Sequence, residues 1–160
     1  MKHPLSLALL VALLLAGCAS QKPPAGHPSS LPPSVAAGAR DCVALAMYWE
    51  ARGEGRDGMA AVGAVVDNRV KSHAFPNDHC SVVYQGGETP PCQFSWWCDG
   101  KSDRPTNQAQ WALALGTAED LLAGRISDPT KGALFFHSTA IRRPWNRTQT
   151  ARIGNHVFYR

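Results

Sequence analysis

The sequence predicts an α+β domain in which a helical part comes first and a small antiparallel sheet follows. Three long segments before residue 124 carry apolar residues at helical spacing. After Asp128-Pro129 the segments become short and rich in aromatic residues, with turn residues between them. Helices followed by strands are typical of the α+β class, in which the two kinds of element are segregated.

The first helix is expected over about residues 40–51, with Asp41 favouring its first turn. A second helix is expected over about 58–70, with Asp57 as N-cap, and a third over about 107–123, with Gly124 as its stop. Their apolar faces are formed by Met59, Val62, Val66 and Val70, and by Trp111, Leu115, Ala118 and Leu122.

Short segments connect and follow these helices. Residues 81–85 are expected to form one turn, and residues 86–105 an irregular loop because they hold three prolines and three glycines. Strands are expected over residues 133–137 and 156–159, with a turn at Gly154-Asn155 just before the second.

Residues 1–17 have the features of a signal peptide. A short basic start precedes an apolar run over residues 5–16, which is too short to span a bilayer as a mature helix. The run ends in Leu15-Ala16-Gly17-Cys18, which resembles the bacterial lipobox, whose cysteine is lipidated and becomes the new N-terminus. Acyl chains on Cys18 would anchor the chain to a membrane. An ordinary signal peptide is the alternative.

Residues 18–38 are rich in Pro, Ser, Gly and Ala and are expected to form a flexible tether after the lipidated Cys18. The folded domain is then residues 39–160, with no internal repeat and no further membrane-crossing segment. Ala19 follows the cysteine, where an aspartate would mark inner-membrane retention. The lipobox resemblance therefore implies the periplasmic face of the outer membrane in a diderm bacterium.

Charge and motifs exclude several classes of function. The formal charge of the full chain is +4, and removing Lys2 with the signal peptide leaves about +3. The basic residues are scattered except for Arg142, Arg143 and Arg147, so nucleic acid is not an expected partner. The sequence has no P-loop, no dinucleotide fingerprint and no G-x-S-x-G, and no cofactor is expected.

Four cysteines besides Cys18 suit an oxidising compartment. Cys92 and Cys98 bracket a short loop and most simply pair with each other, which leaves Cys42 to pair with Cys80. A four-thiolate zinc site is the competing interpretation, but no C-x-x-C occurs.

A zinc site formed by His79, His137 and His156 is also conceivable. It would lack the H-x-x-x-H and H-E-x-x-H patterns, so no metal is expected.

Glu50 is the leading candidate for a general acid. It follows Tyr48 and Trp49 on a mostly apolar segment, where a carboxylic acid can keep its proton near neutral pH. Glu54 comes one helical turn later but lies between two glycines, which predicts a position in the loop after the helix. The alternative is a surface glutamate paired with Arg52 or Arg56.

The second candidate region is the loop Gln93-Phe94-Ser95-Trp96-Trp97-Cys98. Aromatic faces on a rigid loop stack on sugar rings, and Gln and Ser side chains bond hydroxyl and acetamido groups. At least one aromatic residue is expected in the core, but not both adjacent tryptophans, because neighbours in an extended segment face opposite ways. His137 is a weaker candidate, for which a structural role is the alternative.

Six motifs follow one another from residue 48 to residue 159. They are Y-W-E-A-R-G-E-G, A-V-G-A-V-V-D-N-R-V, F-P, C-Q-F-S-W-W-C-D-G, D-P-T-K-G-A-L-F-F-H and I-G-N-H-V-F-Y. Together they resemble the SleB/CwlJ family of cell-wall hydrolases, over nearly the whole domain from about Asp41.

That resemblance implies a fold similar to lysozyme, in which a helical part and a small sheet flank a glycan groove. It implies cleavage of peptidoglycan between N-acetylmuramic acid and N-acetylglucosamine, with Glu50 as the catalytic residue. The chain is expected to act as a monomer. Glu54, Gln93, Phe94, Ser95, Trp96 and His137 are the expected substrate contacts. The mild positive charge suits such an anionic polymer.

The resemblance also implies lytic transglycosylation, in which one glutamate acts first as acid and then as base. Water-using glycosidases generally need two carboxylates. Glu54 is the obvious partner and could instead be structural, and Asp67 is the next choice. Since no peptidoglycan-binding module precedes the domain, envelope remodelling is expected in preference to a spore role. The alternatives are a non-catalytic wall-binding lipoprotein and a zinc amidase.

Overall fold

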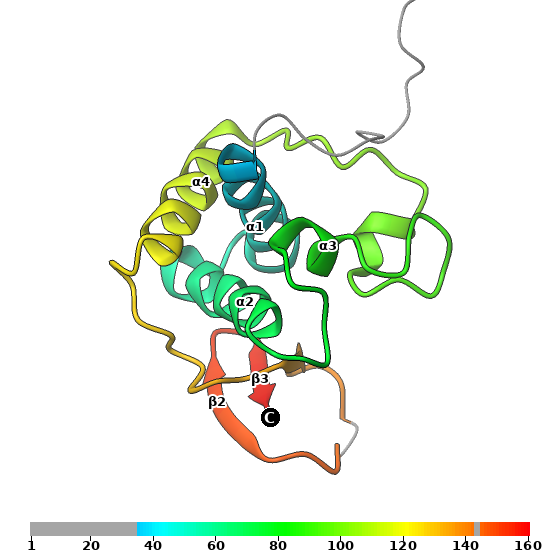
Figure 1. Ribbon diagram of the computed structural model, residues 1–160, viewed down its shortest axis with the longest axis vertical. Helices are drawn as coiled ribbons and strands as arrows, with labels where there is room; N and C mark the ends of the chain where they lie inside the picture. The colour runs from blue at the N-terminus through cyan, green and yellow to red at the C-terminus, as the bar shows by residue number, and fades with distance from the viewer. Residues whose placement is uncertain (1–34, 143–144) are drawn as a thin grey trace, which may run out of the picture.

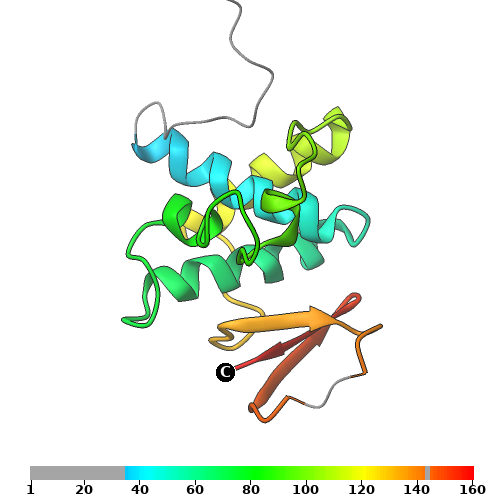
Figure 2. The same ribbon diagram turned by 90° about the vertical axis from the view of Figure 1, so that its right-hand side faces the viewer.

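The computed structural model describes residues 35–142 and 145–160. The expected signal peptide, Cys18, most of the expected tether and Arg143 lie outside the described residues. Within them, a helical part lies on one side of a small three-stranded sheet (Figures 1 and 2). This arrangement confirms the predicted α+β class.

The helical part contains α1 (Val35–Ala51), α2 (Gly55–Val70), α3 (His79–Val83) and α4 (Gln108–Leu122), with the short 3-10 helix η1 (Ser95–Cys98) in the expected irregular loop. The three long helices and Glu50 on the last turn of α1 are as expected. α1 begins five residues before the expected residue 40. α2 begins at Gly55, so its N-cap residue is Glu54 and the expected cap at Asp57 is wrong.

The helices pack closely where a small side chain at their contact lets their axes approach one another. α1 contacts α2, α3 and α4. At Gly63 of α2 a Cβ atom would collide with Met47 of α1 and crowd Leu121 of α4. This glycine therefore lets three helices approach one another around the main core.

The sheet is antiparallel with the strand order β1-β3-β2, formed by β1 (Phe135–Ser138), β2 (Gln149–Ile153) and β3 (His156–Tyr159). β3 and the turn before it are as predicted. β1 starts two residues later than expected, and β2 was missed because it is a half-exposed edge strand without apolar alternation. Phe158 packs on Ala61 and Val65 of α2, which fixes the sheet against that helix (Figure 2).

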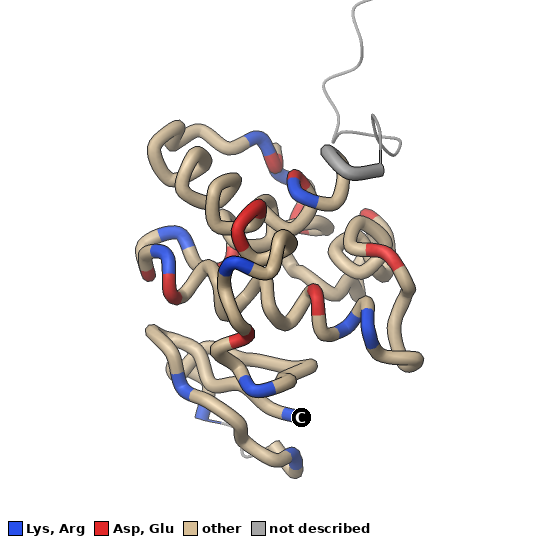
Figure 3. The backbone as a smooth tube through the Cα atoms, turned by 60° about the vertical axis from the view of Figure 1, so that its left-hand side comes forward, with Lys and Arg blue, Asp and Glu red and all other residues tan. Residues whose placement is uncertain are grey.

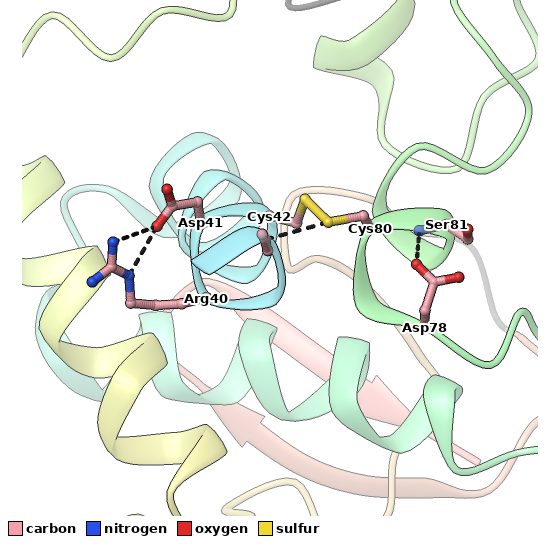
Figure 4. The surroundings of a disulfide bond; sticks show 7 residues. Arg40, Asp41, Cys42, Asp78, Cys80 and Ser81 are labelled. Atoms are coloured by element: carbon pink, nitrogen blue, oxygen red, sulfur yellow. Dashed lines mark hydrogen bonds and ion pairs between the residues drawn. A yellow bond between two sulfur atoms is a disulfide. The ribbon is translucent and has the colours of Figure 1, made fainter. Parts of the chain in front are cut away.

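Two disulfides confirm the predicted pairings. Cys42–Cys80 joins α1 to α3 across the main core (Figure 4), and Cys92–Cys98 closes the loop that contains η1. Asp78 caps α3 by accepting a hydrogen bond from the Ser81 amide at 2.8 Å.

Charge is distributed unevenly between the two parts of the domain. Acidic and basic positions alternate over the helical part (Figure 3). The chain after Lys131 contains no Asp or Glu, and its described arginines are all exposed: Arg142, Arg147, Arg152 and Arg160. The sheet end of the molecule is therefore basic. In the part of the chain that the structure describes, no helix has the length and apolar character needed to cross a membrane.

Candidate active site

Glu50 lies on the last turn of α1, half-buried. Burial raises the pKa of its carboxyl to about 7, and the positive charge of Arg69 opposes part of that rise. No hydrogen bond to another residue within 35–142 or 145–160 contributes to the pKa of this carboxyl. At neutral pH the side chain is therefore divided between its acid and base forms.

The alternative of a surface ion pair does not hold for Glu50. The Arg52 guanidinium lies over the ring of Trp49, 4.9 Å from its centroid, and Arg56 instead pairs with Asp120 of α4. The nearest arginines in sequence are thus engaged elsewhere, and burial dominates the environment of Glu50.

Two aromatic residues hold the end of α1 in place beside Glu50. The buried Tyr48 hydroxyl accepts hydrogen bonds from the backbone amides of Thr106 and Asn107, at 3.2 and 3.1 Å, just before α4 begins. Trp49 stacks on Trp96 of η1, with ring centroids 6.4 Å apart. The last turn of α1 is thereby attached both to α4 and to the disulfide loop.

Arg69, on the last turn of α2, is only 2% exposed. Its Nε donates to the Leu134 carbonyl at 2.8 Å, and its guanidinium lies 5.1 Å from the ring centroid of Phe75 and 5.6 Å from that of Phe94. With the Gln93 amide turned so that its oxygen faces Arg69, both Nη atoms donate to it at 3.2 Å. Burial lowers the pKa of Arg69 to about 10, so it remains charged at neutral pH.

The disulfide loop presents its polar residues and buries its aromatic ones. Gln93 and Ser95 are exposed, whereas Phe94, Trp96 and Trp97 are 3%, 7% and 6% exposed. The expectation that the adjacent tryptophans would not both be buried is wrong, because η1 is a helical turn and not an extended segment. It packs Trp96 against Trp49 and Trp97 against Tyr84.

Glu54 lies between α1 and α2 and contacts the tip of the β2–β3 hairpin. Its carboxylate accepts a hydrogen bond from the Asn155 amide at 3.1 Å and lies 3.2 Å from His156 Nδ1. Its side chain is only 11% exposed, and a Cβ atom at Gly58 or Gly154 would collide with it. The carboxylate is thus engaged in a contact between the helical part and the sheet.

His137, on β1, uses both ring nitrogens within the sheet. Nδ1 lies 2.8 Å from the Ser138 carbonyl and Nε2 lies 2.9 Å from the Tyr159 hydroxyl. A neutral ring that donates from Nδ1 and accepts at Nε2 satisfies both contacts. These contacts favour the structural alternative for this histidine, whose role in substrate binding stays a prediction.

Asp67, the next choice after Glu54 for a second carboxylate, pairs with His79 at 3.2 Å and with Lys71 at 2.5 Å. These contacts hold the pKa of Asp67 below the usual range. Within the described segments no three His, Cys, Asp or Glu side chains form a metal-binding group. Arg69 thus contacts Gln93 and its charge acts on Glu50, so these three form one candidate group, while Glu54, Asp67 and His137 each bond elsewhere.

Arg69 is the one member of this group that the sequence analysis missed. A signal was present, because residue 69 lies seven positions after Val62 and three after Val66, on the apolar face of its helix. An arginine at that helical position is buried unless the helix ends before it. Near a helix C-terminus, however, arginine also suits the helix dipole, which masks the signal.

Comparisons with known proteins agree with this fold. Residues 53–159 match the family described as Cell Wall Hydrolase. The chain is 34% identical over 121 residues to the spore cortex-lytic enzyme of Bacillus subtilis (strain 168), covering 72% of this chain and 35% of that protein. It is 33% identical over 140 residues to the spore cortex-lytic enzyme of Bacillus cereus, covering 86% of this chain and 50% of that protein. The chain thus spans about a third to a half of the length of these curated relatives.

Two solved structures are also similar. The catalytic domain of the Bacillus cereus SleB protein superimposes with a TM-score of 0.60 and 29% identity, covering 81% of this chain and 95% of that chain. The catalytic domain of the germination-specific lytic transglycosylase SleB from Bacillus anthracis gives a TM-score of 0.61 and 27% identity, covering 81% and 100%.

Proposed function

The chain belongs to the cell wall hydrolase family, and on that premise we propose that it cleaves the glycan strands of peptidoglycan with Glu50 as its single catalytic acid and base. The observation that carries the proposal is the half-buried carboxyl of Glu50, whose pKa is about 7. The family match begins at residue 53, so the role of Glu50 rests on its surroundings and on the E-A-R-G-E motif.

The proposed reaction begins with protonated Glu50. It donates its proton to the oxygen between N-acetylmuramic acid and N-acetylglucosamine, and the C–O bond to the muramic anomeric carbon breaks. The muramic C6 hydroxyl then attacks that carbon and gives its proton to the Glu50 carboxylate. The products are a 1,6-anhydro-muramic end and a free N-acetylglucosamine end, and Glu50 is again protonated.

Two observations support this internal attack over attack by water. A glycosidase that activates water uses a second carboxylate about 5 Å or about 6.5–9.5 Å from the first. Glu54 and Asp67, the two candidates, are each engaged in a contact that holds the fold together. In addition, one of the similar solved structures is described as a lytic transglycosylase.

We further propose that the enzyme acts in envelope remodelling as a monomeric lipoprotein, anchored through Cys18 to the periplasmic face of the outer membrane of a diderm bacterium. The lipobox-like sequence and the residues 18–38 that follow it support an anchor with a tether. The exposed arginines of the sheet end suit an anionic wall polymer as partner.

The test is digestion of purified sacculi by the parent chain and by Glu50→Gln, with mass analysis of the released fragments. The parent should release glycan fragments about one water lighter than those with reducing ends, and Glu50→Gln should lose at least about 100-fold in rate. The control is Glu119→Gln on α4, whose side chain is 61% exposed and which should retain parent activity.

Three results would overturn parts of the proposal. A folded Glu50→Gln variant with parent activity would remove Glu50 from catalysis. Reducing ends in place of anhydro ends would make the enzyme a muramidase. Binding of sacculi by the parent without release of any fragment would favour a non-catalytic wall-binding protein.

A further inference from the structure

Resting on the proposed function, we propose that Arg69 is the positioning residue of this site. Its guanidinium, only 2% exposed, connects α2 to the start of the sheet through the Leu134 carbonyl and holds the amide oxygen of Gln93 in the disulfide loop. Arg69 touches no substrate in this scheme. It acts through the two residues that do, Gln93 and Glu50.

The first part of the inference is mechanical. Arg69 belongs to α2, donates a hydrogen bond from Nε to the carbonyl of Leu134 at the start of the sheet, and holds the Gln93 amide oxygen with both Nη atoms. A planar guanidinium provides such a two-pronged contact, and the rounded ammonium of lysine does not. Because the oxygen of Gln93 is committed to Arg69, its NH₂ group is left as a donor on an exposed side chain, suited to a carbonyl or hydroxyl oxygen of the sugar.

The second part is electrostatic. Arg69 has no carboxylate within ion-pair distance among the residues the structure describes, and its charge lies instead among the faces of Phe75, Phe94 and Phe135. Burying a cation without a contacting counter-ion is costly. The charged group to which it is coupled is Glu50, and the coupling acts on both residues.

The consequence for Glu50 follows from the opposing effects of burial and charge. Burial alone favours the neutral form of the carboxyl and raises its pKa. A carboxyl with too high a pKa is a weak acid and donates its proton poorly. The Arg69 charge stabilises the carboxylate that forms when the proton leaves, and it does so without an ion pair that would hold the side chain away from the sugar. Arg69 thus keeps the proton transferable in both directions.

The experiment combines two variants of the full chain, Arg69→Met and Arg69→Lys, with Arg125→Met as control. Arg125 is an exposed arginine at the end of α4. Glu50 is titrated directly by NMR of ¹³C-labelled glutamate carboxyls, which needs no substrate. The chain holds four glutamates, at positions 50, 54, 88 and 119, and the signal missing in Glu50→Gln identifies Glu50.

We expect Arg69→Met to raise the titration midpoint of Glu50 by about one pH unit, because the variant removes the positive charge that opposes the effect of burial. The alkaline limb of the pH–rate profile should move with it. Arg69→Lys keeps the charge, so its midpoint should stay near that of the parent while the cleavage rate falls about tenfold through the loosened Gln93. Arg125→Met should change neither.

Unchanged Glu50 midpoints in both Arg69 variants would overturn the electrostatic part, whether or not the protein cleaves peptidoglycan. Failure of the proposed function would appear separately, as an inactive parent whose Glu50 still titrates as described. Should Arg69→Met not fold, a double-mutant cycle between Arg69→Lys and Gln93→Ala decides the mechanical part. The mechanical part is supported if Arg69→Lys lowers the rate at least about threefold less in the Gln93→Ala variant than in the parent. It is overturned if Arg69→Lys lowers the rate by the same factor in both.

Discussion

Glu50 and Glu54 show how two glutamates four positions apart acquire different properties from their surroundings. Glu50 ends α1 within an apolar environment that resists its charge, with its pKa raised to about 7. Glu54 lies after the end of the helix, and its carboxylate contacts the Asn155 amide and the His156 imidazole. A carboxyl without a hydrogen bond or ion pair is suited to exchange a proton, and one with two partners is suited to hold elements together.

The raised pKa of Glu50 also predicts its effect on stability. Below about pH 4.5, the ordinary value, both folded and unfolded states are protonated and Glu50 costs nothing. Between that pH and 7 the unfolded state ionises first, so stability falls as pH rises. Glu50→Gln should therefore stabilise the protein by up to about 3 kcal/mol at pH 8 and by close to nothing at pH 4.

Urea unfolding of the parent and Glu50→Gln at both pH values measures this difference. Glu88→Gln, an exposed loop position, serves as the control and should leave the unfolding midpoint unchanged. An equal effect of Glu50→Gln on stability at pH 4 and pH 8 would mean that burial does not raise the pKa of the Glu50 carboxyl in the folded protein.

At the scale of elements, the contact of Glu54 with the β2–β3 hairpin is the link whose removal is easiest to measure. Glu54→Ala should destabilise the fold by about 1–3 kcal/mol, because it leaves the Asn155 amide and His156 without their partner. Gly154→Ala should also destabilise it, since Gly154 has φ +55° and an added methyl group would meet the Glu54 carboxylate.

The two substitutions are expected to be non-additive. Once Glu54 is alanine, the methyl group at position 154 has space, and only the backbone cost of its positive φ remains. Urea unfolding of the two single variants and the double variant gives the coupling energy. Full additivity would show that the hairpin tip does not rest on Glu54.

The two disulfides should separate stability from activity. Cys42–Cys80 closes 38 residues and its removal should cost about 4 kcal/mol, whereas Cys92–Cys98 closes six and should cost about 2 kcal/mol. The shorter one, however, frames Gln93 and η1. We expect paired Cys→Ala variants to show the larger stability loss for the first bridge and the larger loss of cleavage rate per molecule still folded for the second. A larger loss of cleavage rate from removing Cys42–Cys80 would show that the loop closed by Cys92–Cys98 does not contribute to the active site.

For the molecule as a whole, local patterns predicted what depends on local chemistry. Helical periodicity located the three long helices, and an oxidising compartment with one short cysteine loop gave both disulfide pairings. β2 could not be predicted, since an exposed edge strand such as Q-T-A-R-I is defined by its pairing with β3 and not by its own composition.

The same limit applied to the site. Glu50 was recognisable from its apolar neighbours in sequence, but the partners of Arg69 lie at positions 93 and 134 and meet it only in the folded chain. The burial of Trp96 and Trp97 likewise depended on the 3-10 turn and on Trp49 and Tyr84, which come from other elements. Residues that act through long-range contacts carry little signal in their own neighbourhood.

The initial rate of sacculus cleavage by the parent chain, measured from pH 4.5 to 9 at low substrate, is the most direct test that a buried glutamate supplies the proton. At low substrate concentration the pH dependence of the rate reports the pKa of the essential acid in the free enzyme. We predict a rate that falls on the alkaline side with a midpoint near 7, the pKa of Glu50. A rate that continues to rise through pH 8 would contradict that account, because a carboxyl that has lost its proton cannot protonate the glycosidic oxygen.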